Sequence, residues 1–257
     1  MTFSIGSWSF HRLYETGQMS VFGYIESLSQ RYRVTRADIW NGMLVSTDDA
    51  YIDLVDQALR REEIEVACLA VDHADIWHEH PDKRAHQHQV ALRYLEIARK
   101  LRVKTLRIDM GVMSPDMTDE QFTHLVDRYR QYTVVAHDWG FRIGPQTHQP
   151  GSLVATNLTR LQQALNTPAF GVLLDVGRWP HAAEESDLEV APYTMHVHFD
   201  RAFIDLFGDA LPRKVKLLQE AGYNGCWSLE SRAGEHEYLN VAQDLAAVRR
   251  AVSIVIG

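Results

Sequence analysis

Short apolar runs recur along the chain at intervals of about thirty residues, which is the length of one strand-helix unit. Strands of a parallel sheet that are buried on both faces have this near-continuous apolar character. The runs therefore predict eight strands, at residues 3–8, 37–40, 65–71, 105–109, 142–146, 171–175, 194–199 and 225–230.

Most of these runs are followed by an amphipathic stretch. Apolar residues keep helical spacing over residues 90–101 and 215–221, and residues 241–256 predict a last helix. The alternation predicts a parallel sheet, and eight units predict a closed (β/α)8 TIM barrel, which a chain of 257 residues can form as a single domain over residues 1–257. The alternative is an open doubly wound sheet, but the segment Ile5-Gly6-Ser7-Trp8 lacks its glycine-rich phosphate-binding motif.

Potential metal ligands stand at the ends of three successive predicted strands. Asp175 ends the sixth run, His198 lies near the end of the seventh, and Glu230 ends the eighth. Because the carboxyl ends of parallel strands meet at one edge, these side chains are expected to converge. An imidazole and two carboxylates form a ligand set that suits a divalent cation.

Three segments resemble the xylose isomerase-like family of sugar isomerases and epimerases, which also includes metal-dependent dehydratases and apurinic endonucleases. They are residues 3–10 (FSIGSWSF), residues 95–101 running into 105–109, and residues 222–230 (GYNGCWSLE), which are the most specific match. The resemblance implies a TIM barrel with one divalent ion, held by Glu, Asp, His and Glu from the last four strands. Those positions here are Gln146, Asp175, His198 and Glu230.

Gln146 departs from the family pattern, which has a glutamate there. A glutamine offers a neutral oxygen that can still bind a hard cation, but it cannot accept a proton. Metal affinity is therefore expected to fall, and Glu230 remains as a ligand and a possible base. His148 lies two residues further along the predicted strand, on the same face, and is a candidate for the second acid-base role.

Other polar and aromatic residues at strand ends are candidates for substrate binding. They are Trp8, Trp40, His73, Arg107, Arg178, His196 and Arg201. Indole rings suit the C–H faces of sugars, and an arginine can hold a carboxylate or phosphate with two hydrogen bonds. Simpler interpretations stay open: the tryptophans could pack between loops, His196 could hydrogen-bond within the barrel mouth, and Arg107 and Arg201 could form surface salt bridges. Many family members carry a histidine at position 178, which contributes to a second metal in the endonucleases, so Arg178 speaks against a DNA-cleaving site.

The resemblance implies an isomerase or epimerase that uses one divalent ion (Mn, Mg, Co or Zn) on a small sugar or polyhydroxy carbonyl compound, through an enediolate. The missing carboxylate at position 146 gives weight to a dehydratase, in which a β-hydroxyl leaves from the same enediolate. A catalytically silent barrel that binds a sugar or pairs with another subunit is a further alternative.

Composition and charge limit the classes of binding partner and the cellular location that we expect. A formal net charge of -8 argues against nucleic acid, which requires a basic surface. No leader-like segment opens the chain and no apolar stretch is long enough for a bilayer, so we expect a cytoplasmic protein without a membrane partner. Cys68 and Cys226 lie in apolar runs and are expected to be buried, reduced thiols. A homo-oligomer stays open.

Overall fold

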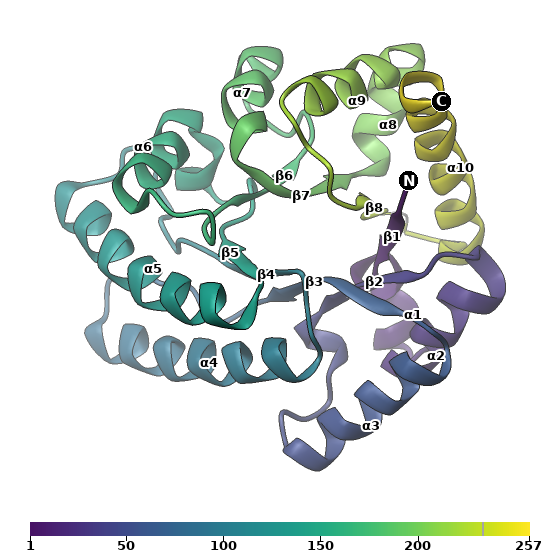
Figure 1. Cartoon of the computed structure of the whole chain (residues 1–257), viewed down its shortest axis with the longest axis horizontal. Coiled ribbons are helices and arrows are strands. Elements are labelled where there is room, and N and C mark those ends of the chain that lie inside the picture. Colours follow the sequence, from purple (N-terminus) through teal and green to yellow (C-terminus); the bar gives the residue numbers. More distant parts are fainter. Residues whose placement is uncertain (233) are drawn as a thin grey trace.

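Eight parallel strands form a ring at the centre of the molecule, with helices around it (Figure 1). The computed structural model describes residues 1–232 and 234–257. The strands are β1 (Phe3–Gly6), β2 (Arg36–Trp40), β3 (Glu65–Val71), β4 (Thr105–Ile108), β5 (Arg142–Gly144), β6 (Val172–Asp175), β7 (Thr194–Phe199) and β8 (Trp227–Leu229). The helices are α1 (His11–Glu15), α2 (Val21–Ser27), α3 (Asp49–Arg61), α4 (Pro81–Lys100), α5 (Asp119–Trp139), α6 (Ala155–Leu165), α7 (Ala183–Val190), α8 (Arg201–Phe207), α9 (Leu211–Glu220) and α10 (Glu237–Ile256).

The sheet runs in the order β5-β4-β3-β2-β1-β8-β7-β6. Between its two ends, isolated bridges join Ile143 to Phe170 and Gln146 to Leu173, which nearly closes the ring. The predicted single-domain (β/α)8 TIM barrel is therefore confirmed. The Gln146–Leu173 bridge also sets Gln146 beside the strand that ends at Asp175, so barrel closure and the placement of a candidate ligand depend on the same contact.

Local sequence signals explain where the elements begin and end. Thr118 accepts a hydrogen bond from the backbone of Gln121, whose side chain bonds back to Thr118, so α5 begins with a capping box. The helix ends at Gly140, whose φ of 77° lies in the left-handed region that glycine adopts readily. All six residues of β7 are buried, as expected for a strand inside a helix-covered barrel.

Five predicted strands are shorter than expected, and three of them, β1, β5 and β8, carry candidate site residues beyond their observed ends. The fifth was predicted over residues 142–146, but β5 ends at Gly144 because Pro145 follows and has no backbone N–H for the ladder. The first was predicted to reach Trp8, but β1 ends at Gly6 and Trp8 lies in a short 3-10 turn. His148 consequently does not lie on a strand, and its predicted place on the strand face of Gln146 was wrong.

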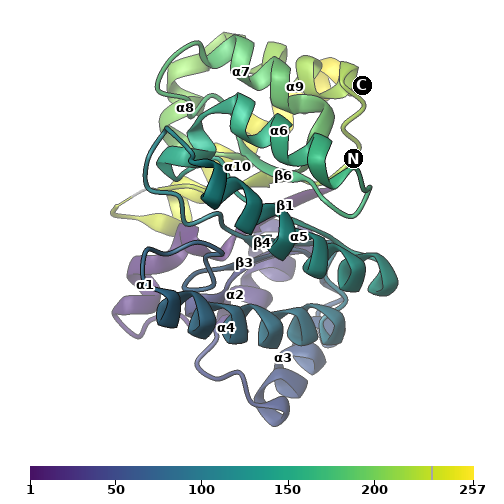
Figure 2. The same cartoon turned by 90° about the vertical axis from the view of Figure 1, so that its left-hand side faces the viewer.

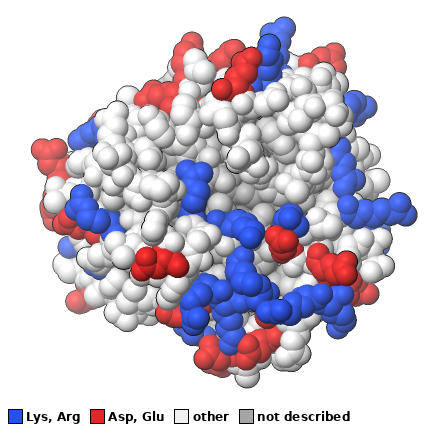
Figure 3. All heavy atoms as spheres, in the orientation of Figure 1, with Lys and Arg blue, Asp and Glu red and all other residues white. Residues whose placement is uncertain are grey.

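Both chain termini lie at one end of the barrel, the face shown in Figure 3, and the carboxyl ends of the strands point to the other end (Figure 2). On the terminal face, basic side chains gather in the lower part of the view (Figure 3). At the C-terminal ends of α3 and α4, Arg60 and Arg102 pair with Asp56, and Lys100 pairs with Asp53.

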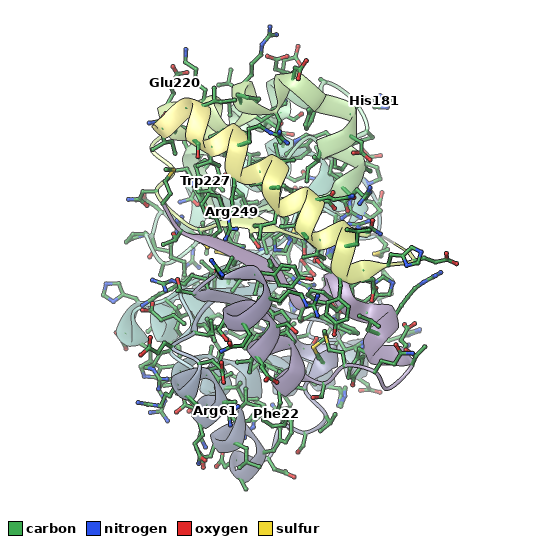
Figure 4. The ribbon with its side chains drawn as sticks, turned by 90° about the vertical axis from the view of Figure 1, so that its right-hand side faces the viewer. Phe22, Arg61, His181, Glu220, Trp227 and Arg249 are labelled. Carbon is green, nitrogen blue, oxygen red and sulfur yellow. The ribbon has the colours of Figure 1, made fainter. Side chains whose placement is uncertain are left out.

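The helix α10 runs past β1 along the outside of the barrel (Figure 4), and its Arg249 guanidinium stacks on the Phe3 ring at 5.6 Å. Cys68 and Cys226 are both buried free thiols, as predicted. Within the described part of the chain, no helix has the length and apolar character needed to cross a membrane.

Candidate active site

A cavity of about 270 Å³ opens at the carboxyl ends of the strands. Its lining is mostly polar and aromatic and comes from β-strand ends around the ring: Trp8, Trp40, Ala70, Asp72, Arg107, Gln146, His148, Arg178, Glu230 and Arg232. Seven of the candidate residues predicted from the sequence are among these, namely Trp8, Trp40, Arg107, Gln146, His148, Arg178 and Glu230. The cavity is large enough for a small molecule.

Three potential ligands converge beside this cavity. Nδ1 of His198 lies 3.4 Å from Oδ1 of Asp175 and 3.5 Å from Oε2 of Glu230. Asp175 and His198 are buried, whereas the Glu230 side chain is 13% exposed and forms part of the pocket wall. One atom from each residue falls within 4.8 Å of the other two, which is a spacing that one cation could bridge.

Gln146 completes the group. Its Nε2 donates a hydrogen bond to Oδ1 of Asp175 at 2.8 Å and lies 3.4 Å from Nδ1 of His198. The amide therefore faces the same point as the three other side chains. A half-turn of the amide would exchange its nitrogen for its oxygen and present a neutral ligand there.

Asp38, in β2, lies beneath this cluster and was missed by the sequence analysis. Its Oδ2 accepts hydrogen bonds from Nε2 of His198 at 2.8 Å, Nε2 of His196 at 2.7 Å and Oγ of Ser228 at 2.8 Å. A carboxylate on the far nitrogen of a ligating histidine fixes the orientation of the ring. The only sequence signal for it was an acidic residue inside the buried run Ala37-Asp38-Ile39.

The electrostatics favour charged forms in this cluster. Burial alone would lower the pKa of His198, but the negative charges of Glu230 and Asp38 raise it well above its ordinary value. Burial alone would raise the pKa of Asp175. The hydrogen bond from His198 and the positive charges of His198 and Arg178 instead hold this pKa below its usual range. Nδ1 of His198 thus lies between the carboxylates of Asp175 and Glu230.

His148 belongs to a second network on the opposite wall. Its Nε2 donates to Oδ2 of Asp109 at 2.9 Å, and Arg107 pairs with both Asp109 and Asp72. Burial would raise the pKa of Asp109, but the charges of Arg107 and His148 hold it below its usual value. Trp40 joins this wall by donating its indole N–H to Asp72 at 2.6 Å.

Three of the predicted substrate-binding residues do not line the cavity. His73 is exposed, with a φ of 63° that places it in a left-handed turn. Arg201 pairs with Asp244 at 3.3 Å on the side of α8. His196 is buried and hydrogen-bonded to Asp38, which agrees with the simpler interpretation of this residue.

The donor set fits a divalent cation. Two carboxylates, one imidazole and one rotatable amide combine oxygen and nitrogen ligands, which suits Mg²⁺, Mn²⁺, Co²⁺ or Zn²⁺. The hydrogen bond from His198 to Asp38 leaves Nδ1 directed at Asp175 and Glu230, so the ring is oriented as a metal ligand requires.

Comparison with known proteins agrees with the barrel fold. Residues 31–251 match the family model described as Xylose isomerase-like TIM barrel. The chain therefore belongs to the xylose isomerase-like TIM barrel family. No curated protein sequence matches it.

Several solved structures share the fold. A D-psicose 3-epimerase with D-tagatose from Clostridium cellulolyticum H10 is 15% identical, with a TM-score of 0.74 over 100% of this chain and 97% of that one. A xylose isomerase-like barrel protein from Mycobacterium smegmatis in complex with magnesium is 13% identical, with a TM-score of 0.74 over 99% and 97%. The probable 3-DHS dehydratase AsbF from Bacillus anthracis is 13% identical, with a TM-score of 0.72 over 97% and 99%.

Proposed function

We propose that this protein is a divalent-metal-dependent isomerase or epimerase that acts on a small sugar or a related polyhydroxy carbonyl compound. The proposal is carried by the convergence of Asp175, His198 and Glu230 beside a small pocket. The D-psicose 3-epimerase and the magnesium complex among the structural neighbours support a carbohydrate-like substrate and a divalent ion. Cytoplasmic location, the oligomeric state and the absence of nucleic-acid or membrane partners stay predictions.

An ion held by Asp175, His198 and Glu230, with Gln146 as a fourth ligand, would polarise the carbonyl and neighbouring hydroxyl of the substrate. Glu230 is the residue that can take the proton from the adjacent carbon, because its carboxylate lines the pocket. Return of that proton to the neighbouring carbon of the enediolate gives isomerisation. Return to the other face of the same carbon gives epimerisation.

His148 is the candidate for the second proton transfer. It lines the pocket and its Nε2 is bonded to Asp109, so Nδ1 is the ring nitrogen that can exchange a proton with a substrate. The negative charge of Asp109 stabilises the imidazolium that forms when His148 accepts a proton. Gln146 cannot take this role, because an amide does not accept a proton.

Dehydration is the second candidate function, and the neutral side chain of Gln146 favours it. A two-carboxylate epimerisation loses one base here, whereas dehydration needs Glu230 to remove a proton and an acid to protonate the leaving hydroxyl. His148, backed by Asp109, can supply that acid. The probable dehydratase AsbF among the structural neighbours supports dehydration as the second candidate.

The test is a screen of ketoses, inososes and keto-glycosides with purified protein and added Mn²⁺, followed by Glu230→Gln on any substrate found. Loss of a general base is expected to lower kcat by about 100- to 10,000-fold. The matched control is Glu220→Gln, which changes an exposed carboxylate at the end of α9. Glu220 lies at the opposite end of the barrel from His181, which belongs to the loop between β6 and α7 (Figure 4). Normal turnover in Glu230→Gln would refute the mechanism.

His148→Ala then separates the reactions. With one base at the reacting carbon, an isomerase keeps most of its activity. An epimerase that uses His148 instead stops incorporating solvent deuterium on the opposite face, as read by NMR. A dehydratase that uses His148 as its acid loses product formation but still exchanges the substrate proton with solvent. A protein without bound metal, insensitive to chelators and inactive on every substrate would favour the silent sugar-binding barrel.

A further inference from the structure

Three arginines line the candidate active-site cavity. They differ in how many of their N–H groups already bond to carboxylates of the protein. Arg107 is only 5% exposed and gives both terminal nitrogens to Asp109 and Asp72. Arg178 and Arg232 are more open, with side chains 22% and 40% exposed. The terminal nitrogens of Arg107 are therefore already paired within the cavity wall, whereas Arg178 and Arg232 can reach a bound molecule.

Arg178 and Arg232 each bond to a buried carboxylate that lies outside the cavity lining. Nη1 of Arg178 bonds to Oδ2 of Asp175 at 2.6 Å, and Nε of Arg232 bonds to Oδ2 of Asp200 at 2.8 Å. Neither Asp175 nor Asp200 lines the cavity, and their side chains are 2% and 6% exposed. A guanidinium has five donors, so each arginine is anchored on one edge and keeps others for a ligand.

The two guanidinium groups also come from different loops to the same place. Arg178 lies in the loop after β6 and contacts Oδ2 of Asp175. Arg232 lies in the loop after β8, and its Nη2 is 4.0 Å from the same oxygen. Two positive groups therefore flank one carboxylate oxygen. Planar guanidinium groups in this arrangement match the geometry of a carboxylate or a phosphate.

The charge balance at Asp175 changes once the site is loaded. Asp175 is the counter-ion of Arg178 and also a proposed ligand of the divalent ion. When its single negative charge is shared with a dication, the positive charge of Arg178 is no longer balanced. An anionic group on the substrate would restore the balance at this wall, while Trp8 and Trp40 offer apolar surface elsewhere in the cavity.

We propose that the substrate carries an oxyanion, a carboxylate or a phosphate, and that Arg178 and Arg232 bind this group. The inference rests on the proposed function, because it names the substrate class of that same site. It places the charged end of a polyhydroxy carbonyl compound at the loops after β6 and β8, and its reacting carbons beside Glu230.

The test uses three probes that differ only in their charged group: glycerate, glycerol phosphate and glycerol. Binding to the protein with Mg²⁺ present is measured by calorimetry at constant ionic strength. Glycerate, glycerol phosphate or both are expected to bind at least about tenfold more tightly than glycerol, since a hydrogen bond to a charged group contributes roughly 1.5–3 kcal/mol. The tighter of the two anions identifies the group that the site prefers.

Arg178→Gln and Arg232→Gln are each expected to lower the affinity for the preferred anion by about tenfold or more. Arg178→Lys keeps the charge without the planar fork and should fall between wild type and Arg178→Gln. The matched control is Arg130→Gln, because Arg130 pairs with Asp127 three residues away on α5, as Arg178 pairs with Asp175, but outside the cavity. Circular dichroism verifies that each variant is folded.

The inference is overturned if neither anion binds more tightly than glycerol, or if both glutamine variants bind the anions as wild type does. Because no turnover is measured, its failure is distinct from failure of the proposed function. Metal-dependent conversion of a neutral ketose without anion binding would refute the inference alone. Anion binding that depends on both arginines, in a protein with no metal-dependent activity, would refute the proposed function alone.

Discussion

Two clusters in the barrel share His198 and have nearly the same composition. One consists of Asp38, His196 and His198, and the other of Asp175, His198 and Glu230. In both, the potential ligand atoms lie within 4.8 Å of one another. By residue type and spacing alone, each could hold a metal ion.

Hydrogen bonding and access separate the two clusters. Oδ2 of Asp38 already accepts three hydrogen bonds of 2.7–2.8 Å, from His196, His198 and Ser228, and all of these residues are buried. In the other cluster Glu230 reaches the cavity, and Nδ1 of His198 lies between the carboxylates of Asp175 and Glu230. The first cluster is closed and the second is open.

Access is the main difference: both oxygens of Asp175 also accept hydrogen bonds, from Gln146 and Arg178, but the cavity reaches this cluster at Glu230. His198 serves both clusters with different nitrogens: Nε2 is fixed by Asp38, and Nδ1 faces the open side. In the proposed function, the closed cluster would orient His198 and the open cluster would bind the ion.

The largest expected effect comes from removing a ligand of the open cluster. Asp175→Ala should weaken Mn²⁺ binding by about 1,000-fold or more, equivalent to about 4 kcal/mol, because it removes a charged ligand. Calorimetry and metal analysis of the purified protein measure this. Asp127→Ala, which removes an exposed carboxylate on α5, should leave metal content unchanged. Full metal content in Asp175→Ala would mean that the open cluster is not the metal site.

A charge deletion in the closed cluster should act on stability. Asp38→Asn leaves His196 and His198 without their anion, and breaking a buried charge pair costs about 3 kcal/mol at neutral pH. Although burial alone would raise the pKa of Asp38, the charges of the two histidines hold it below its ordinary value. Ionised Asp38 therefore stabilises the fold above its unfolded pKa of about 4, and this stabilisation is lost as the pH falls through the lower folded pKa.

Urea unfolding of metal-free wild type and Asp38→Asn at several pH values checks this sign. The difference in unfolding free energy should be complete at pH 5–7 and should shrink progressively below about pH 4. Asp127→Asn, in an exposed ion pair, should differ from wild type by less than about 1 kcal/mol throughout. A difference for Asp38→Asn that stays constant down to pH 2 would contradict the assignment.

The sequence predicted the barrel well because its signal is periodic and repeated. All eight strands occur where apolar runs were seen, and the errors lie at their ends. Pro145 ends β5 two residues early, so Gln146 and His148 reach the cavity from a turn in which the N–H of His148 bonds to the carbonyl of Gln146. Period-two reasoning cannot describe such a turn.

The open cluster was predictable because its members lie at or next to strand ends, with Glu230 directly after β8, and a parallel barrel gathers strand ends. Asp38 was not, because it lies inside a strand and its partners His196 and His198 are more than 150 residues away in the chain. Asp200, the anchor of Arg232, also escaped notice. Such pairings depend on which strands become neighbours across the barrel interior, and the local pattern carries no such information.

The smallest expected effect concerns the neutral member of the open cluster. Gln146 now donates to Asp175 at 2.8 Å, so it behaves as a partner of the carboxylate rather than as a charged ligand. Gln146→Glu replaces that donor with a third carboxylate. Without an ion the new charge is repelled by Asp175 and Glu230, so the metal-free variant should be less stable than wild type. With Mn²⁺ the charge becomes a ligand, and affinity should increase about tenfold, equivalent to about 1.4 kcal/mol. The increase in melting temperature on adding a fixed concentration of Mn²⁺ should therefore be larger in the variant than in wild type.

Gln149→Glu is a suitable control, since Gln149 is a nearby glutamine that bonds to Asp75 instead. If Gln146→Glu gave unchanged or weaker Mn²⁺ binding, position 146 would not face the ion, and the open cluster would consist of three ligands alone.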